Sequence, residues 1–150
     1  RERVNRVIGA ADGALRRLGV ARPKIYVSGL NPHAGEGGLF GREEIEIISP
    51  AIADAAGRGI DVAGPFGADT MFHKKDCDAF VVMLHDQGHI TAKLLAQNAT
   101  AGLAIGTPIL FSSVAHGSAF DIAGKGVANP TAMVEAIKRL CAVPATAAAA

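Results

Sequence analysis

Short apolar runs alternate along this chain with segments of helical periodicity, and this alternation limits its fold more than any other feature. The strand-like runs are 24–29, 60–64, 79–84, 102–106 and 108–114. Apolar residues recur at helical spacing over 2–18 and 42–58, and further helices are expected to begin near His89 and after Asn129. The run AFVVML (79–84) is apolar throughout, which is typical of a parallel strand covered on both faces. The sequence therefore predicts an α/β fold with a mainly parallel sheet and flanking helices.

Two Xaa-Pro pairs indicate where helices begin. Ser49-Pro50 lies inside 42–58 and has the form of an N-cap followed by a first-turn proline, so we expect a kink or two short helices there. Asn129-Pro130 has the same form and is expected to cap the last helix. Residues 144–150 (PATAAAA) form a low-complexity tail.

The composition argues against several functional classes. The net charge is +1 with no basic run, so we expect no nucleic-acid partner. No apolar stretch is long enough to span a membrane, so we expect no membrane partner. Cys77 and Cys141 share no metal or redox spacing and indicate reduced thiols in the cytoplasm. The chain starts with Arg1 inside a helical pattern, which favours a fragment of a longer protein.

Two histidines and a carboxylate follow strand-like runs. His33 comes soon after run 24–29, and His85 and Asp86 directly follow run 79–84. Ligands of open α/β sheets gather at the carboxyl ends of the strands, so the two imidazoles could converge on one metal ion. A catalytic metal needs about three protein ligands, and the third would have to come from elsewhere. The alternative is that each histidine is only a hydrogen-bonded loop residue.

His85 and His89 are four residues apart, a spacing that suits a metal pair on one helix. Because His85 falls at the end of a strand-like run, we expect that the pair does not share a helix face and that His89 is a supporting or packing residue. Lys93 could hold an anionic substrate or act as an acid, or it could be a solvated helix lysine. The loop NPHAGEGG (31–38) could cradle an anion with its backbone N–H groups, with Glu36 as a ligand, a base or a loop cap.

The segment AHGSAFDIAGKGVANP (115–130) is a long irregular connection, a kind that is usually functional. Small residues at 117–119 would let a flat ligand approach the backbone. Asp121 could accept hydrogen bonds from two ribose hydroxyls and would repel a 2′-phosphate, which favours NAD over NADP. Asn129 offers the donor and the acceptor that an adenine edge requires. The alternative is an ordinary Ω-loop in which Asn129 only caps a helix.

Four motifs together resemble the 4-hydroxythreonine-4-phosphate dehydrogenase family of pyridoxine biosynthesis. They are GLNPHAGEGG (29–38), GADTMF (67–72), LHDQGHI (84–90) and HGSAFDIAGKG (116–126), in the family's order. The last also resembles the adenine-binding loop of isopropylmalate and isocitrate dehydrogenases. The resemblance implies an isocitrate/isopropylmalate dehydrogenase-like fold, of which this chain is a part. It implies that 1–84 belongs to a middle domain for substrate, metal and dimerisation, that 85–143 belongs to an NAD-binding domain, and that 144–150 is a tail.

The same resemblance implies an NAD-dependent homodimer that needs a divalent metal (Zn, Mg, Mn or Co) and oxidises a secondary alcohol, often with decarboxylation. His33 and His85 match family metal ligands, and the third family ligand lies upstream of this sequence. Lys93 matches the substrate-binding lysine, while Asp69 and Asp86 match carboxylates near the site, which makes these three the expected catalytic residues. The expected cofactor contacts are His116, Gly117, Ser118, Ala119, Asp121, Ile122 and Asn129.

Two positions depart from the biosynthetic enzymes of the family. Those enzymes carry an Asn and an Arg that contact the phosphorylated substrate, where this chain has Gly102 and Phe111. Loss of a permanently charged Arg alters a phosphate site, and Phe111 would supply an apolar wall instead. The segments MLHDQGHI (83–90) and ILFSSVAHGSA (109–119) resemble more closely the branch that oxidises the cis-dihydrodiol of terephthalate, a substrate without phosphate. Three alternatives remain: a dehydrogenase of 4-hydroxythreonine 4-phosphate or of a sugar-acid phosphate, a metal-dependent hydrolase or lyase without NAD, and an inactive fragment.

Overall fold

The computed structural model describes residues 1–96 and 100–141. The chain divides into two compact units, Arg1–Thr91 (unit 1) and Ala92–Ala150 (unit 2), and the division falls inside one helix. No helix in the described ranges is long and apolar enough to cross a membrane. The sequence places a domain boundary after residue 84. The assignment of the two parts to a middle domain and an NAD-binding domain stays a prediction.

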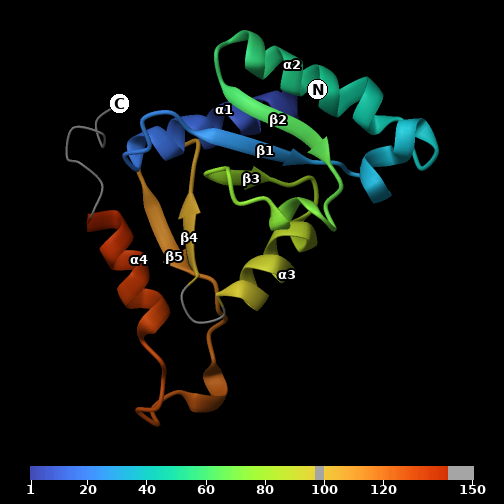
Figure 1. Cartoon of the computed structure of the whole chain (residues 1–150). Coiled ribbons are helices and arrows are strands. Elements are labelled where there is room, and N and C mark those ends of the chain that lie inside the picture. The colour runs from blue at the N-terminus through green and yellow to red at the C-terminus, as the bar shows by residue number, and fades with distance from the viewer. Residues whose placement is uncertain (97–99, 142–150) are drawn as a thin grey trace. The chain divides into compact units, whose positions relative to one another are not determined.

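Unit 1 contains a sheet of three parallel strands. These are β1 (Lys24–Ser28), β2 (Asp61–Phe66) and β3 (Ala79–Val81), in the order β2-β1-β3 (Figure 1). The central strand β1 pairs in parallel with both neighbours. The helical segments are α1 (Glu2–Arg17), η1 (Pro32–Gly38), η2 (Glu44–Ile48), α2 (Ser49–Gly57), η3 (Met71–His73) and α3 (His85–Leu95), which continues into unit 2. A parallel sheet with flanking helices confirms the predicted fold class.

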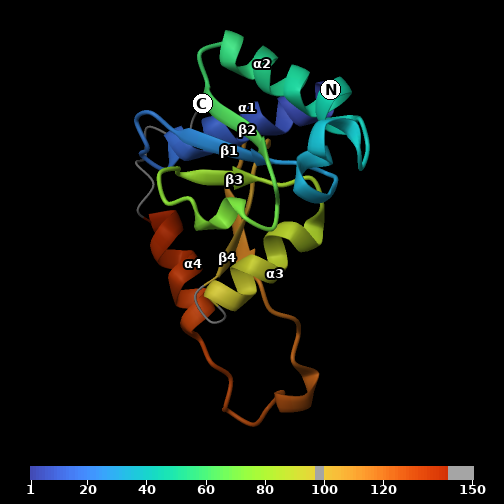
Figure 2. The same ribbon diagram turned by 45° about the vertical axis from the view of Figure 1, so that its right-hand side comes forward.

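One face of this sheet carries the hydrophobic core. Ile25 and Val27 of β1 are fully buried on that face, whereas Tyr26 packs on the other face against the rings of Phe66 and Phe80. Helices α1 and α2 contribute to the core and lie beside the sheet in Figure 2. The buried core residues are Ile8, Ile25, Val27, Ile48, Ile52, Ala55 and Val81. Burying each aliphatic side chain of this size contributes about 1.5–3 kcal/mol, which holds β1 and the start of the loop that follows it.

The predicted helix at 42–58 is broken into two segments as expected, but Ser49 is not the N-cap that the sequence predicts. Ser49 is the predicted N-cap, yet it has helical dihedral angles, because the π-helical turn η2 runs directly into α2 through Ile48. Pro50 falls in the first turn of α2 and has no backbone N–H to donate back to η2, which fits a break between the two segments there. The break into two segments is therefore confirmed, and the cap is wrong.

Unit 2 contains an antiparallel ribbon and a helix. β4 (Ala101–Ala104) pairs with β5 (Phe111–Val114), and α4 (Thr131–Cys141) packs on the ribbon. Both predicted strands exist, although they are shorter than their apolar runs. Between β5 and α4 runs the long irregular segment predicted for 115–130, interrupted by the short turn η4 (Phe120–Ile122) (Figure 1). The tail at 144–150 lies outside the described residues.

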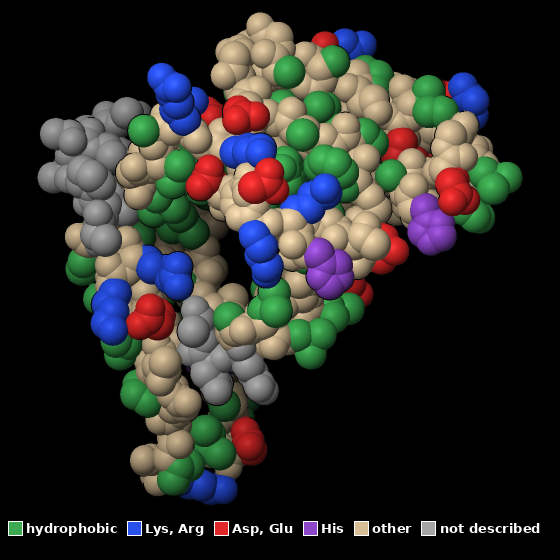
Figure 3. All heavy atoms as spheres, viewed as in Figure 1, with side chains coloured by type: hydrophobic (Ala, Val, Ile, Leu, Met, Phe, Trp, Pro, Cys, Tyr) green, Lys and Arg blue, Asp and Glu red, His purple; other side chains and the backbone are tan. Residues whose placement is uncertain are grey.

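Charged side chains of both signs are mixed on the surface. Figure 3 shows Lys and Arg interspersed with Asp and Glu over the face in view. Several of them pair, as Arg1 does with Asp54 and Arg42 with Glu46. Mixed charge and a net charge of +1 give little field to attract a polyanion.

Candidate functional site

The loop after β1 turns through a left-handed segment. Residues 33–37 all have positive φ, and three of them, His33, Ala34 and Glu36, are not glycine. Left-handed backbone costs roughly 1–2 kcal/mol for each residue that carries a Cβ. Such strain persists only where surrounding contacts fix the conformation, and it clusters at functional sites. The anion cradle predicted for this loop stays a prediction.

Glu44 supplies the contacts that fix this loop. Its side chain is buried, and Oε1 accepts hydrogen bonds from the backbone N–H groups of Leu30 (2.7 Å) and Asn31 (2.8 Å). Its other oxygen, Oε2, accepts from the side-chain amide of Asn31 at 2.9 Å. Burial alone would raise the pKa of Glu44, but the hydrogen bonds from Asn31 and Leu30 outweigh burial and lower that pKa below its ordinary value. Glu44 therefore stays ionised and anchors the start of the loop that carries His33.

Two glycines leave room for the Glu44 carboxylate. A Cβ on Gly35 would lie 2.6 Å from Glu44 Oε2, and a Cβ on Gly29 would lie 3.0 Å from Oε1 and 2.7 Å from Ala34 Cα. Gly35 also has φ +80°, a conformation that disfavours a side chain. Close packing on a buried carboxylate thus accounts for two of the glycines in this motif.

A cavity of about 340 Å³ lies beside this loop. Its lining residues are Leu30, Asn31, Pro32, His33, Ala68, Asp69 and Gln87. The structure thus brings together His33 and Asp69, two predicted site residues, with Gln87, which sequence reasoning overlooks. His33 Nδ1 lies 3.5 Å from Glu36 Oε1, and the His33 ring packs edge-on against Phe40 at a centroid distance of 6.0 Å. The His33 side chain is more than half exposed, so a ligand can reach it.

The start of α3 corrects two expectations. The helix begins at His85 rather than near His89, and the rings of His85 and His89 share a helix face. They stack with centroids 4.2 Å apart and planes 9° from parallel. His85 Nδ1 also lies 2.7 Å from Asp86 Oδ1, and both of these side chains are more than 70% exposed. The predicted ligand His85 and the predicted catalytic Asp86 are therefore adjacent and open to solvent.

The error arises because an apolar run does not guarantee strand pairing. β3 ends at Val81, and the backbone N–H groups of Met83 and Leu84 donate to Gln87 Oε1 at 2.9 Å each. The Gln87 amide, Nε2, donates to the carbonyl of Gly29 at 3.1 Å. A Gln at the third helical position that reaches back to the residue before the helix is one half of a capping box. This spacing was readable in the sequence, but only once the helix start was known.

The two predicted metal ligands lie at one edge of the sheet. His33 and His85 follow β1 and β3, neighbouring parallel strands whose carboxyl ends lie at one edge of the sheet. Imidazole suits Zn²⁺ and similar ions. Among residues 1–96 and 100–141, no group of three His, Cys, Asp or Glu side chains is arranged to hold an ion. These residues therefore fit a metal only as two members of a larger ligand set, and a further ligand is needed, as the resemblance implies.

Lys93 lies in the last turn of α3, and its side chain is exposed. His85 belongs to unit 1 and Lys93 to unit 2, so Lys93 is described only by its place within α3. Its role in holding substrate stays a prediction.

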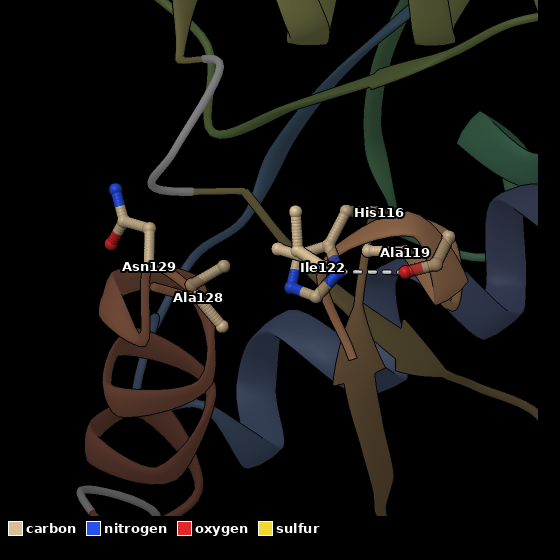
Figure 4. Close-up of a pocket in the computed structure, with 7 residues that line it drawn as sticks. His116, Ala119, Ile122, Ala128 and Asn129 are labelled. Carbon is tan, nitrogen blue, oxygen red and sulfur yellow. Dashed lines mark hydrogen bonds between the residues drawn. The ribbon is translucent and has the colours of Figure 1, made fainter. Parts of the chain in front are cut away.

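A second cavity, of about 430 Å³, lies in unit 2. Its lining residues are His116, Gly117, Ala119, Ile122, Ala128, Asn129 and Ala132. Figure 4 shows Ala128 and Asn129, next to the start of α4, on one side, and His116, Ala119 and Ile122, from the segment after β5, on the other. The lining is mostly small and apolar, as a flat aromatic base requires, with polar groups only on His116 and Asn129. Five of the seven predicted cofactor contacts therefore surround one cavity.

The remaining two predicted contacts, Ser118 and Asp121, are exposed and lie outside that lining. Ala119 between them has left-handed dihedral angles, which turns the chain into η4. Asn129 Oδ1 accepts a hydrogen bond from the Thr131 N–H at 2.9 Å, which confirms the predicted cap of α4. The cap uses the amide oxygen, whereas an adenine acceptor would need the NH₂ group.

Comparison with known proteins gives one consistent family. Residues 1–140 match the family described as pyridoxal phosphate biosynthetic protein PdxA. A D-threonate 4-phosphate dehydrogenase of Salmonella typhimurium is 48% identical, over 91% of this chain and 42% of its own length. A 1,2-dihydroxy-3,5-cyclohexadiene-1,4-dicarboxylate dehydrogenase of Comamonas sp. is also 48% identical, over 92% of this chain and 45% of its own length.

Solved structures agree with this result. The crystal structure of a 4-hydroxythreonine-4-phosphate dehydrogenase from Klebsiella pneumoniae is 45% identical and superposes with a TM-score of 0.83, over 95% of this chain and 45% of that one. The chain therefore spans less than half the length of the relatives it matches.

Proposed function

We propose that this chain, which belongs to the pyridoxal phosphate biosynthetic protein PdxA family, carries the cofactor loop and part of the metal site of an NAD- and divalent-metal-dependent dehydrogenase of a secondary alcohol. The relatives named above are dehydrogenases. The observation that carries the proposal is the cavity between His116 and Asn129, whose small apolar lining suits an adenine ring. Because the relatives are longer than this chain, the activity is proposed for the whole protein.

The residues around this cavity have the chemistry that an adenine nucleotide needs. Gly117 and Ala119 allow a ring to approach the backbone, and Ile122 offers an apolar face. Asn129 would pair with the adenine edge, while the exposed Asp121 would accept from ribose hydroxyls and disfavour a 2′-phosphate. NAD, when bound, takes up the hydride that the alcohol carbon gives up on oxidation.

The loop after β1 and the start of α3 would hold the substrate end of the site. His33 and His85 would each give one imidazole to a divalent metal (Zn, Mg, Mn or Co), which acts as a Lewis acid when bound. Asp86, in contact with His85 Nδ1, would fix the ring so that its other nitrogen is the one that binds. Asp69 and Lys93 are the groups we assign to substrate binding and to transfer of the hydroxyl proton.

For the substrate we favour a ring diol without phosphate. Gly102 pairs with Ser113 and Phe111 pairs with Ala104, so Gly102 and Phe111 lie on the same face of the β4–β5 ribbon. Phe111 is 63% exposed, and neither strand carries a charged residue. An apolar ring on that face supports the branch represented by the dicarboxylate dehydrogenase of Comamonas, whose named substrate has a carbon ring and no phosphate group. The two carboxylates of such a substrate would need partners other than residues of β4 or β5.

A second candidate is a phosphorylated hydroxy acid. It is favoured by the relatives that are named D-threonate 4-phosphate dehydrogenase, which match this chain as well as the Comamonas enzyme does. In that case a cation other than one on β4 or β5 must bind the phosphate, and Lys93 is the predicted group.

We also propose that the protein is a cytoplasmic homodimer without a nucleic-acid or membrane partner. The apolar side chains of Leu39, Phe40 and Ile45 are exposed in unit 1 and support self-association there. Sedimentation at several protein concentrations tests the dimer.

The decisive experiment measures NADH formation by the longest natural form of this protein. It is supplied with Mn²⁺, Mg²⁺ or Zn²⁺ and, in parallel, with the cis-dihydrodiol of terephthalate, D-threonate 4-phosphate and 4-hydroxythreonine 4-phosphate. NADH from the dihydrodiol alone supports the favoured substrate. NADH from a phosphorylated substrate alone rejects it in favour of the second candidate. No NADH from any of them, together with no NAD binding, rejects the dehydrogenase and brings forward a metal-dependent hydrolase or lyase.

A further inference from the structure

Gln87 touches both of the chain segments that lead to the predicted metal ligands. Its Nε2 donates to the Gly29 carbonyl, at the exit of β1 toward His33. Its Oε1 accepts from the N–H groups of Met83 and Leu84, directly before His85. The sequence separation between Gly29 and Gln87 is 58 residues, so this one side chain joins two segments that the chain itself does not connect locally.

Ser28 completes this junction. It is fully buried at the end of β1, and its Oγ donates to Gln87 Oε1 at 3.2 Å while it accepts from the Met83 N–H at 3.2 Å. Gln87 Oε1 thus receives hydrogen bonds from one buried hydroxyl and two backbone amides. Because the buried Ser28 hydroxyl would be costly to leave unpaired, the network favours one arrangement of the β1 exit and the α3 start.

The predicted ligand His85 and its neighbour Asp86 have few other contacts to hold them. The His85 and Asp86 side chains are more than 70% exposed and touch each other and His89. Their placement therefore depends on the backbone at the start of α3, which is the backbone that Gln87 holds. Gln87 also lines the same cavity as His33 and Asp69, so it borders the space that a bound substrate would occupy.

We propose that Gln87 is a positioning residue that sets the separation between His33 and His85 and thereby the affinity of the site for its metal. This inference rests on the proposed metal-dependent function. It assigns to Gln87 no contact with the metal: the residue acts through the main chain on both sides of the site.

The test compares three variants of the longest natural form of the protein. Gln87→Met keeps the side-chain volume and removes every hydrogen bond of the amide. Gln87→Glu keeps an oxygen that accepts from Met83 and Leu84 but cannot donate to Gly29. Asn5→Ala is the matched control, because Asn5 joins α1 to α2 through both amide atoms, with Ala51 (3.0 Å) and Arg58 (2.7 Å), away from the site.

Metal affinity is measured without NAD or substrate, by titration with Co²⁺ and its visible absorption. Thermal unfolding is recorded beside it. We expect Q87M to bind Co²⁺ about tenfold or more weakly, as is typical when support of a metal ligand is lost, with Q87E in between and N5A unchanged. NAD affinity should be the same in all three, because the adenine cavity has no part in this network.

The inference is overturned if Q87M loses thermal stability to the same extent as N5A and yet binds Co²⁺ as the natural protein does. His33→Ala and His85→Ala separate this result from failure of the proposed function. If these two variants weaken Co²⁺ binding and Q87M does not, only the role of Gln87 is rejected. If the natural protein binds no Co²⁺ through His33 and His85, the metal site and this inference are both rejected.

Discussion

Glu44 and Asn31 are joined by two hydrogen bonds, one from the Asn31 backbone N–H to Oε1 at 2.8 Å and one from its side-chain amide to Oε2 at 2.9 Å. Asn31 is the residue at which the chain enters the left-handed turn that carries His33. Glu44 begins the π-helical turn η2. A single buried carboxylate thus links the helical layer of unit 1 to the loop of a predicted metal ligand.

The first prediction is that this link makes folding sensitive to acid. The hydrogen bonds hold the folded-state pKa of Glu44 below its ordinary value of 4.5. The stabilisation is therefore present above pH 4.5 and is lost as the pH falls through the lower folded-state pKa. Urea unfolding at a series of pH values should show the free energy of unfolding falling in that range.

Glu44→Gln isolates this contribution. The new NH₂ group would face the Asn31 amide donor, so E44Q should lose about 1–3 kcal/mol of stability at neutral pH and should show a shallower decline in acid. Glu46→Gln is the matched control, since Glu46 lies on the same turn, is more than half exposed and forms an ion pair with Arg42. Equal acid profiles for E44Q and the natural protein would rule out this role for Glu44.

The second prediction separates backbone strain from crowding in the same loop. Gly35 and Gly37 both have positive φ, but a Cβ on Gly35 would meet Glu44 Oε2 at 2.6 Å, whereas a Cβ on Gly37 would meet nothing within 4 Å. Gly37→Ala should cost about 1–2 kcal/mol from the left-handed backbone alone. Gly35→Ala should cost a further 1–3 kcal/mol or so, because the Glu44 carboxylate must move. Chemical denaturation of both variants checks this difference, and equal losses would contradict it.

Local signals in the sequence predicted most of the fold. The periodicity of α1, the apolar strands β1 and β2 and the Asn129 cap each depend on neighbours within a few residues, and each is present in the structure. Glu44 could not be found in this way, because its partner Asn31 lies 13 residues away. Gln87 caps its own helix, but its bond to Gly29 spans 58 residues, and the cap itself is recognisable only once the start of α3 is known. In the sequence, Glu44 looks like a surface glutamate, and Gln87 looks like one polar residue among several in the motif LHDQGHI.

The same limit explains the misplaced start of α3. Met83 and Leu84 continue the apolar run of β3, so the sequence extends the strand to them. In the structure their N–H groups donate to a side chain, and the helix begins at once. Whether a backbone group donates to a strand or to a side chain depends on tertiary contacts, which periodicity does not contain. For the same reason, the sequence does not predict that His85 and His89 stack on one face of α3.

The third prediction separates the two roles assigned to Asn129. Asn129→Asp keeps the oxygen that caps α4 and removes the NH₂ donor that an adenine would need. It should leave thermal stability nearly unchanged and weaken NAD binding. Asn129→Ala should lose both, with about 1 kcal/mol of stability from the cap. Calorimetric titration with NAD and thermal unfolding measure the two effects, and unchanged NAD affinity in both variants would reject adenine recognition by this residue.

The fourth prediction concerns the substrate. Phe111→Arg places a permanent cation on the exposed face of the β4–β5 ribbon that also carries Gly102. If that face borders the substrate, the variant should lower KM for D-threonate 4-phosphate at least tenfold, since a charge-assisted hydrogen bond to phosphate contributes about 1.5–3 kcal/mol. The KM for the ring diol, a dicarboxylate that gains a cation but loses its apolar wall, should fall much less. Ile109→Arg is the matched control, because Ile109 is exposed just before β5 and outside the paired strands. The same KM shift in both variants would show only a general attraction of anions to added charge, and no shift in F111R would place the substrate away from the ribbon.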